Sequence, residues 1–302
     1  MDKFIDLHTH TVHSDGALSP TELVKKAAEI GLSAIAISDH ENVAGLDEAM
    51  EAGKKFGVEI IPAVEISSYP DPLTEHHILG YFINYRDEKL LKALREVKES
   101  REERAAKVVK NLNDLGYEVT FGDVKALAKG TIVQPHLAWS VISNHKNKDK
   151  LKEDFGEIPD TGAFIRKYLV PGTPAYEARK AFTPKEAISL IHEVGGSAIF
   201  AHPCWTTVKK ENGNLIFDDR KFEQITRLGI DGVEVLAHRG EEEDTKKCVE
   251  HFTLLAKKYK LLITGGSDYH GFGSAGKQLG FTDFYLKVPY SILEDLKSKA
   301  KK

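Results

Sequence analysis

The chain has 302 residues, of which 41% are hydrophobic and 29% charged, with a formal net charge of -4. This length supports one large core or a core with an inserted subdomain, and the composition excludes a largely disordered chain. The net negative charge excludes a global positive field that would recruit long duplex nucleic acid. A polyanionic substrate would therefore need local cations or bound metal.

The N-terminus lacks the basic start and long apolar run of a signal peptide, and no later run reaches the roughly 18 apolar residues of a membrane span. The two cysteines, Cys204 and Cys248, have no CxxC spacing, so they predict no disulfide framework and favour a reducing compartment. We therefore expect a cytoplasmic protein with no membrane partner.

Short apolar runs alternate with helical patterns at both ends of the chain. The patterns predict strands at 4–7, 34–37, 58–64, 77–82, 197–201, 232–236 and 261–264, and helices at 20–30, 43–56, 184–194 and 244–259. Apolar strands separated by helices are typical of a parallel sheet covered on both faces. About seven such units favour an α/β fold that closes as a barrel.

Residues 86–180 break this rhythm. A long charged helix is predicted at 87–115 and ends at Gly116, and three more helical segments follow at 121–129, 135–144 and 161–168. We expect an inserted helical cap subdomain over the C-terminal face of a barrel domain formed by residues 1–85 and 181–302, because barrel active sites lie at that face.

Ligand-type side chains recur where the predicted strands end. They are His8, His10, Asp15, His40, Glu65, His77, His202, Asp268 and His270. Any one of them alone is best explained as a satisfied polar residue. Together they would converge in a barrel, and burying so many imidazoles and carboxylates without cations would be prohibitive. Asp39, beside His40, is a candidate for orienting an imidazole.

The donor set predicts the kind of metal. Nitrogen and oxygen ligands without thiolates suit Mn²⁺, Zn²⁺ or Fe²⁺ and disfavour a cysteine-rich structural zinc site. Nine ligands exceed what one ion takes, so we expect two or three divalent metal ions.

Six segments in order, DLHTHTVHSDG, AISDHENVAG, PAVEIS, HHILGY, AHP and GSDYHG, resemble the motifs of the PHP (polymerase and histidinol phosphatase) family. The resemblance implies a distorted (β/α)7 TIM-like barrel and a metal-dependent phosphoesterase that uses metal-activated hydroxide. REERAAKVVKN, QPHLA, FIRKYL and PAYEA are similar to the branch that dephosphorylates nucleoside 3′,5′-bisphosphates and trims short RNA from the 5′ end. The expected partner is therefore a small phosphorylated substrate, either a nucleotide or a short oligonucleotide.

The resemblance also implies three metal positions. The first would be held by His8, His10, Glu65 and Asp268, the second by Glu65, His77 and His202, and the third by Asp15, His40 and His270. His77 rather than His76 is assigned because HILGY follows it directly. Glu65 and Asp268 are the residues on which we expect catalysis to depend.

One position departs from the branch. Gln134 stands where an arginine is expected to grip the substrate phosphate, and glutamine lacks both the charge and the bidentate fork. His136 keeps its place as a candidate phosphate contact. Arg101, Arg104, Lys107 and Lys110 recur every three residues and could supply a compensating positive face, although a solvated helix surface is the interpretation that we favour.

Two alternatives remain at this stage. The same metal site could serve a histidinol-phosphate phosphatase, although the insertion matches the nucleotide-acting branch better. A non-catalytic PHP scaffold or nucleic-acid-binding module is a different class of function, in which missing ligands would be expected. Here all nine ligand positions are filled, which favours an enzyme.

Overall fold

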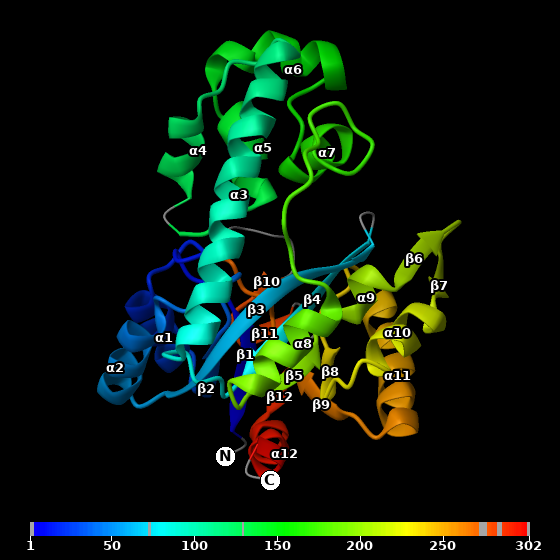
Figure 1. Cartoon of the computed structure of the whole chain (residues 1–302). Coiled ribbons are helices and arrows are strands. Elements are labelled where there is room, and N and C mark those ends of the chain that lie inside the picture. The colour runs from blue at the N-terminus through cyan, green and yellow to red at the C-terminus, as the bar shows by residue number, and fades with distance from the viewer. Residues whose placement is uncertain (1–2, 72–73, 129, 272–276, 283–285, 301–302) are drawn as a thin grey trace. The chain divides into compact units, whose positions relative to one another are not determined.

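The computed structural model describes residues 3–71, 74–128, 130–271, 277–282 and 286–300. It divides into two compact units, one formed by Met1–Leu91 with Phe182–Lys302 and the other by Lys92–Ala181 (Figure 1). The first unit contains the sheet and the second is helical.

An eight-stranded sheet forms the first unit. In spatial order its strands are β12 (Val288–Pro289), β1 (Phe4–Thr9), β2 (Leu32–Ile37), β3 (Glu59–Asp71), β4 (Thr74–Tyr81), β5 (Ser197–Phe200), β8 (Gly232–Leu236) and β9 (Leu262–Gly265). The segment after β9 returns to β1, where His10 N donates to Tyr269 O at 2.9 Å and Thr9 pairs with Tyr269 in a parallel bridge. The sheet is thus a nearly closed barrel, and the predicted α/β barrel is confirmed.

The direction of β4 corrects the prediction of an all-parallel sheet. β4 runs antiparallel to both of its neighbours, β3 and β5, whereas β1, β2 and β3 are parallel, as are β5, β8 and β9. A parallel crossover needs a dozen or more residues, and only a short connection separates β3 from β4. Because β4 runs in the opposite direction, its N-terminal half lies at the edge of the sheet where the parallel strands end.

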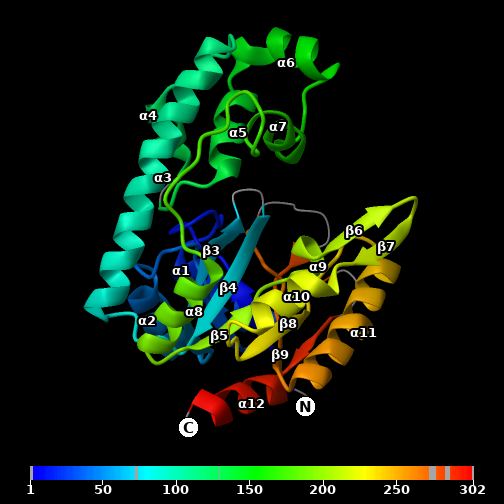
Figure 2. The ribbon, with the colours of Figure 1, turned by 45° about the vertical axis from the view of Figure 1, so that its right-hand side comes forward.

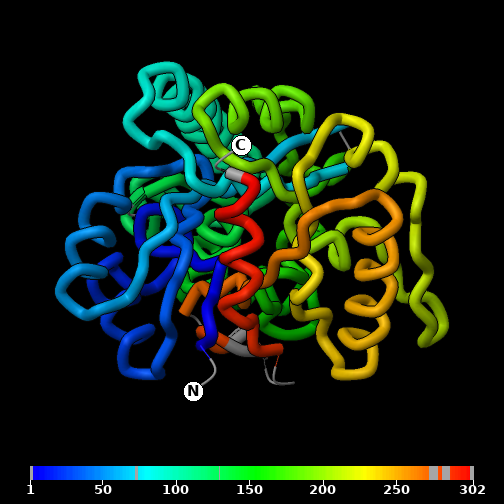
Figure 3. Tube along the Cα trace, turned by 90° about the horizontal axis from the view of Figure 1, so that it is seen from below, coloured from blue at the N-terminus to red at the C-terminus, as the bar shows by residue number. Residues whose placement is uncertain are grey.

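Helices surround this barrel. They are α1 (Pro20–Glu29), α2 (Leu46–Phe56), α8 (Pro184–Glu193), α10 (Asp219–Thr226), α11 (Glu242–Tyr259) and α12 (Tyr290–Ala300). Capping boxes at Ser19 and Thr183, each followed by proline, start α1 and α8. In Figure 3 α12 crosses the bottom of the barrel, and its Leu293 and Leu296 are fully buried in the barrel core. Within the part of the chain that the structure describes, no helix combines the length and the hydropathy of a membrane-spanning segment.

Two small antiparallel ribbons were not predicted. β6 (Val208–Glu211) and β7 (Asn214–Phe217) follow the short helix α9 (Pro203–Thr206) and form the yellow hairpin in Figure 2. β10 (Lys277–Gln278) pairs with β11 (Phe281–Thr282). Strands of two to four residues carry too little periodicity for a sequence pattern to reveal them.

The second unit contains helices and no strand among its described residues. After α3 (Glu88–Asp114), which begins in the first unit, come α4 (Phe121–Leu127), α5 (Gln134–Ile142), a 3₁₀ turn (His145–Asn147), α6 (Lys148–Phe155) and α7 (Thr161–Tyr168). Leu112, Tyr117, Val141, Phe164 and Tyr168 are among the buried residues of its own hydrophobic core. The second unit is therefore stabilised by a hydrophobic core that is distinct from the core of the barrel.

Candidate metal centre

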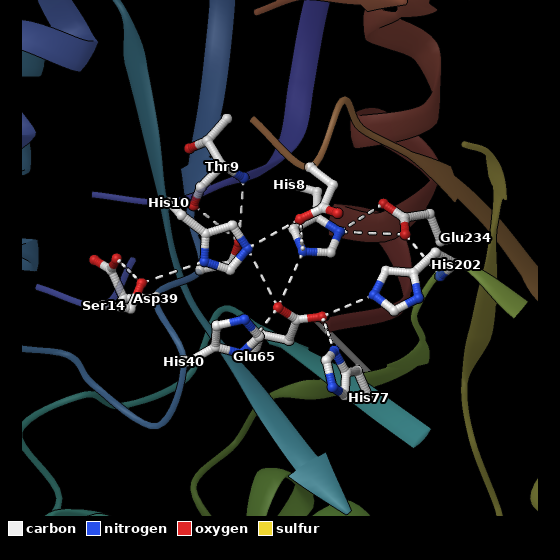
Figure 4. A network of polar contacts seen from close by, with 12 residues as sticks. His8, Thr9, His10, Ser14, Asp39, His40, Glu65, His77, His202 and Glu234 are labelled. Carbon is white, nitrogen blue, oxygen red and sulfur yellow. Dashed lines mark hydrogen bonds and ion pairs between the residues drawn. The ribbon is translucent and has the colours of Figure 1, made fainter. Parts of the chain in front are cut away.

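The structure brings all nine predicted ligands into one cluster at the C-terminal edge of the parallel strands. Glu65 lies at its centre, and five imidazoles, of His8, His10, His40, His77 and His202, point toward its carboxylate (Figure 4). The ring nitrogens nearest Glu65 Oε2 are His8 Nε2 at 3.3 Å, His10 Nε2 at 3.2 Å and His40 Nδ1 at 3.2 Å, and those nearest Oε1 are His77 Nδ1 at 2.8 Å and His202 Nε2 at 3.0 Å. The two carboxylate oxygens of Glu65 therefore contact two different sets of imidazoles.

The other carboxylates extend the cluster beyond Glu65. Asp268 Oδ1 lies 3.5 Å from His8 Nε2 and 3.2 Å from His10 Nε2. Asp15 Oδ1 lies 3.2 Å from His270 Nε2. Three groups have ligand atoms that all lie within 4.8 Å of one another: His8, His10, Glu65 and Asp268; His10, Asp15, His40 and His270; and His40, Glu65 and His77.

Buried polar atoms without a hydrogen bond indicate whether these residues are suited to hold metal ions. Among the described residues, six buried atoms of the cluster make no hydrogen bond: His8 Nε2, His10 Nε2, His40 Nδ1, His202 Nδ1, Asp15 Oδ1 and Glu65 Oε2. A buried polar atom without a partner is costly, and a divalent cation would satisfy several of them at once. The donors are imidazole nitrogens and carboxylate oxygens, so the cluster fits divalent metal ions.

The charges in the cluster are strongly coupled. Burial raises the pKa of the Glu65 carboxyl, but its electrostatic interactions with the imidazoles of His8, His40 and His77 lower it more, so its pKa lies well below the usual range. Burial lowers the pKa of His40 to about 4. For His10, burial also lowers the pKa, but the nearby carboxylates of Asp268 and Glu65 raise it to about 10. Without cations, protons on some of the imidazoles balance the carboxylates.

His77 rather than its neighbour His76 reaches the cluster. Successive side chains of a strand point to opposite faces, and the His76 ring packs edge-on against Phe200 with centroids 5.2 Å apart. His77 lies in the N-terminal half of β4. Had β4 been parallel to its neighbours, His77 would lie at the opposite edge of the sheet, so the reversal of this strand is what allows it to contact Glu65.

Glu234 is a residue of the site that the sequence analysis missed. Its carboxylate lies in β8, where Oε1 is 3.0 Å from His8 Nδ1 and Oε2 accepts a hydrogen bond from His202 N at 2.8 Å. The first contact holds a proton on Nδ1 and directs Nε2 of His8 toward Glu65. A lone glutamate inside the apolar strand GVEVL was the signal that could have identified it.

The Asp39 carboxylate accepts hydrogen bonds from the loop after β1 rather than from an imidazole of the cluster. It accepts hydrogen bonds from Thr11 N and Thr11 Oγ1, both at 2.7 Å, and from Ser14 Oγ at 2.6 Å. Ser14 Oγ in turn lies 3.3 Å from His10 Nδ1. Asp39 therefore orients His10 only through Ser14, and it braces the turn that carries Asp15.

Close backbone approach shapes the site as well. An added Cβ on Gly266 would lie 2.4 Å from His8 Cβ, so only glycine lets the loop that carries Asp268 lie against β1. His202 and Asp268 have φ angles of 26° and 53°, in the left-handed region that non-glycine residues seldom occupy. Such conformations persist where surrounding contacts impose them, and they gather at functional sites.

The predicted substrate contacts lie in the helical unit. Arg104 Nε donates to Glu177 O at 2.7 Å, Arg101 Nη1 to Ile132 O at 3.4 Å and Gln134 Nε2 to Leu169 O at 3.5 Å. His136 Nδ1 accepts a hydrogen bond from Val133 N at 3.2 Å. All four side chains thus contact backbone of their own unit.

The prediction that the four basic residues of α3 lie on a solvent-exposed surface is wrong for its two arginines. Arg101 and Arg104 are only 6% and 7% exposed, whereas Lys107 and Lys110 are exposed. A step of three residues turns a helix roughly 60° short of a full circle, so four such positions span about half of its circumference. The first two face the core of the helical unit and the last two face solvent.

Comparison with known proteins agrees with this geometry. The PHP domain model matches residues 6–182. A 5′-3′ exoribonuclease of Haemophilus influenzae is 32% identical over 95% of this chain and 98% of its own length, and a 3′,5′-nucleoside bisphosphate phosphatase of Chromobacterium violaceum is 29% identical over 98% and 97%. A crystal structure from Bifidobacterium adolescentis, assigned as a metal-dependent phosphoesterase, has 26% identity and a TM-score of 0.77 and covers 98% of this chain and 96% of its own. This chain therefore belongs to the PHP domain family.

Proposed function

We propose that this protein is a metal-dependent phosphoesterase that hydrolyses phosphomonoesters of small nucleotides, such as nucleoside 3′,5′-bisphosphates, and acts on short RNA 5′ ends. The observation that carries the proposal is the cluster around Glu65, where six buried ligand atoms lack a hydrogen bond among the described residues. Relatives of nearly the same length include a bisphosphate phosphatase and an exoribonuclease. Both act on phosphate esters of nucleotides.

We assign two or three divalent ions, of Mn²⁺, Zn²⁺ or Fe²⁺, to this cluster. Such ions supply a water of lowered pKa and neutralise charge that develops on phosphoryl oxygens. Glu65 is proposed as the shared ligand because its two oxygens contact different imidazoles. His77 and His202 both approach Oε1, whereas His8, His10 and His40 approach Oε2. His8, His10 and Asp268 complete the first position, and Asp15, His40 and His270 form the third.

Exposure indicates the open side of the cluster. The side chains of His8, His10 and Glu65 are at most 1% exposed, whereas those of His77, Asp268 and His270 are 19–20% exposed. We propose that the phosphoryl group enters on the side of the more exposed ligands. The buried ligands would exclude water from the rest of the cluster, which strengthens electrostatic interactions there.

The insertion is proposed to supply substrate contacts. Gln134 and His136 are partly exposed, so their polar atoms could reach a ligand, and Gln134 would provide a hydrogen bond without charge. Arg101 and Arg104 are buried against backbone carbonyls. We therefore expect the two arginines to act through the positive field that they place around Gln134 more than through direct contact.

The test compares two variants on the same strand. Glu65→Gln removes the shared ligand, whereas Glu59→Gln alters a glutamate of β3 that instead pairs with Lys297. Each protein is assayed for bound metal by mass spectrometry and for turnover of adenosine 3′,5′-bisphosphate, a 5′-phosphorylated short RNA and histidinol phosphate. We expect Glu65→Gln to lose metal and at least 1000-fold in turnover, on the order of a lost metal-activated nucleophile, while Glu59→Gln keeps both.

The same assay separates the alternatives. Preferred turnover of histidinol phosphate would replace the nucleotide proposal by the histidinol phosphatase one. A metal-loaded protein that hydrolyses none of the three compounds would indicate a non-catalytic module. Full metal content and turnover in Glu65→Gln would contradict the assignment of the centre itself.

A further inference from the structure

An exposed indole lies three residues after one of the proposed metal ligands, His202. Trp205, in α9, is 46% exposed, although tryptophan side chains are on average highly buried. Its backbone nitrogen donates to His202 O at 2.9 Å, which places it one helical turn beyond that histidine. The proposed function assigns no role to this side chain.

A guanidinium from the loop after the neighbouring strand β8 lies over the Trp205 ring. The Arg239 guanidinium carbon is 4.3 Å from the centroid of the Trp205 ring. Arg239 follows the end of β8, five residues after Glu234, and β8 is parallel to β5, whose end leads into His202. Since the ends of parallel strands lie at one edge of a sheet, Trp205 and Arg239 come from the edge that carries the metal ligands.

Hydrogen bonds fix the orientation of both groups without covering the indole. Trp205 Nε1 donates to His238 O at 2.8 Å, and Arg239 Nη2 donates to Val208 O at 3.2 Å. Arg239 Nε is buried and makes no hydrogen bond within the described residues. The ring is therefore held in one orientation while nearly half of the residue remains exposed.

We propose that Trp205 and Arg239 form a platform on which the nucleobase of the substrate stacks while its phosphate occupies the metal cluster. Indole rings and guanidinium planes are the groups on which proteins stack unpaired bases, because every base presents a flat π face. The platform rests on the proposed function and deepens it, since it selects esters that carry a purine or pyrimidine. It accepts different bases, because stacking reads no hydrogen-bond pattern.

The kinetic test separates stacking from a merely structural role. Turnover of adenosine 3′,5′-bisphosphate is compared with that of base-free ribose 3,5-bisphosphate in Trp205→Ala and Trp205→Phe. For the adenosine ester, Trp205→Ala is expected to lower kcat/KM by about 5- to 150-fold, mainly through KM, and Trp205→Phe to restore most of it. Turnover of the base-free ester stays unchanged. Leu254→Ala, at a residue of α11 that is 66% exposed, is the matched control and changes neither substrate.

Fluorescence gives a second readout that does not depend on activity. Trp139 and Trp205 are the two tryptophans of the chain, so Trp139→Phe leaves Trp205 as the sole indole. Rapid mixing with adenosine 3′,5′-bisphosphate should quench its emission before turnover, whereas ribose 3,5-bisphosphate should not. A 5′-phosphorylated RNA with and without its first base shows whether the stacked base also comes from an RNA end.

The outcomes distinguish the platform from the proposed function. Quenching by the adenosine ester without turnover would support the platform and contradict the phosphoesterase proposal. Suppose instead that the adenosine ester is turned over without quenching, and that Trp205→Ala hydrolyses each of the two esters as fast as the unaltered protein does. This result would overturn the platform and leave the phosphoesterase proposal standing. An equal loss on both substrates in Trp205→Ala would also overturn it, because the indole would then only support the fold.

Discussion

Removal of the Glu234 carboxylate should weaken metal binding although Glu234 is not itself a proposed ligand. In Glu234→Ala, His8 Nδ1 loses its partner at 3.0 Å and His202 N loses its acceptor at 2.8 Å. His8 Nε2 would then no longer be held toward Glu65. Changes of this kind beside metal-binding histidines cost roughly 10- to 100-fold in metal affinity or activity.

The same substitution should also lower the stability of the metal-free protein. The backbone N–H of His202 would be left buried without its acceptor, at a cost of about 1–3 kcal/mol in the free energy of unfolding. Glu234→Gln keeps one amide oxygen as an acceptor, so it should fall between Glu234→Ala and the unaltered protein in both quantities. We expect this order because the carboxylate accepts hydrogen bonds from two donors, His8 Nδ1 and His202 N, whereas the single amide oxygen of glutamine can replace only one of its two oxygens.

Metal affinity is measured by competition with a chelator of known affinity, and stability by urea unfolding of the chelated protein. Glu241→Ala is the control, since Glu241 is the residue that precedes α11 and its side chain makes no cap hydrogen bond. Metal affinity in Glu234→Ala equal to that of the control would refute the positioning role. A loss of stability with no change in affinity would reduce Glu234 to a structural residue.

Three further outcomes follow from the structure. Gly266→Ala should displace His8 and lower metal content in mass spectrometry, because its Cβ would lie 2.4 Å from His8 Cβ; normal content would contradict this close approach. Tyr81→Phe should lower the free energy of unfolding by about 1–3 kcal/mol in urea, because the buried Tyr81 hydroxyl donates to Leu7 O at 2.7 Å. Burial raises the pKa of the Cys248 thiol to about 11, so this thiol should resist a thiol-specific reagent at pH 8 until the protein is unfolded; rapid labelling of the native protein would disprove that.

The residues of the cluster were predictable from the sequence because most of them lie at the ends of strands that the sequence already defines. His8 and His10 share one face of β1 through their two-residue spacing, and Glu65 lies in an apolar strand of the expected length. The closed barrel followed from the alternation of apolar strands with helices. Family-like motifs around these residues then distinguished the candidate ligands from the other histidines.

Only the tertiary structure decided how these residues meet. The reversal of β4, which brings His77 to Glu65, depends on pairing with β3 and β5 rather than on any property of the β4 sequence. Glu234 becomes part of the site because β8 lies beside β5, so that one carboxylate reaches both His8 and His202. Local patterns reveal which face of a strand or helix a residue occupies, but not which distant residue packs against that face. That choice is made by pairing between strands far apart in sequence.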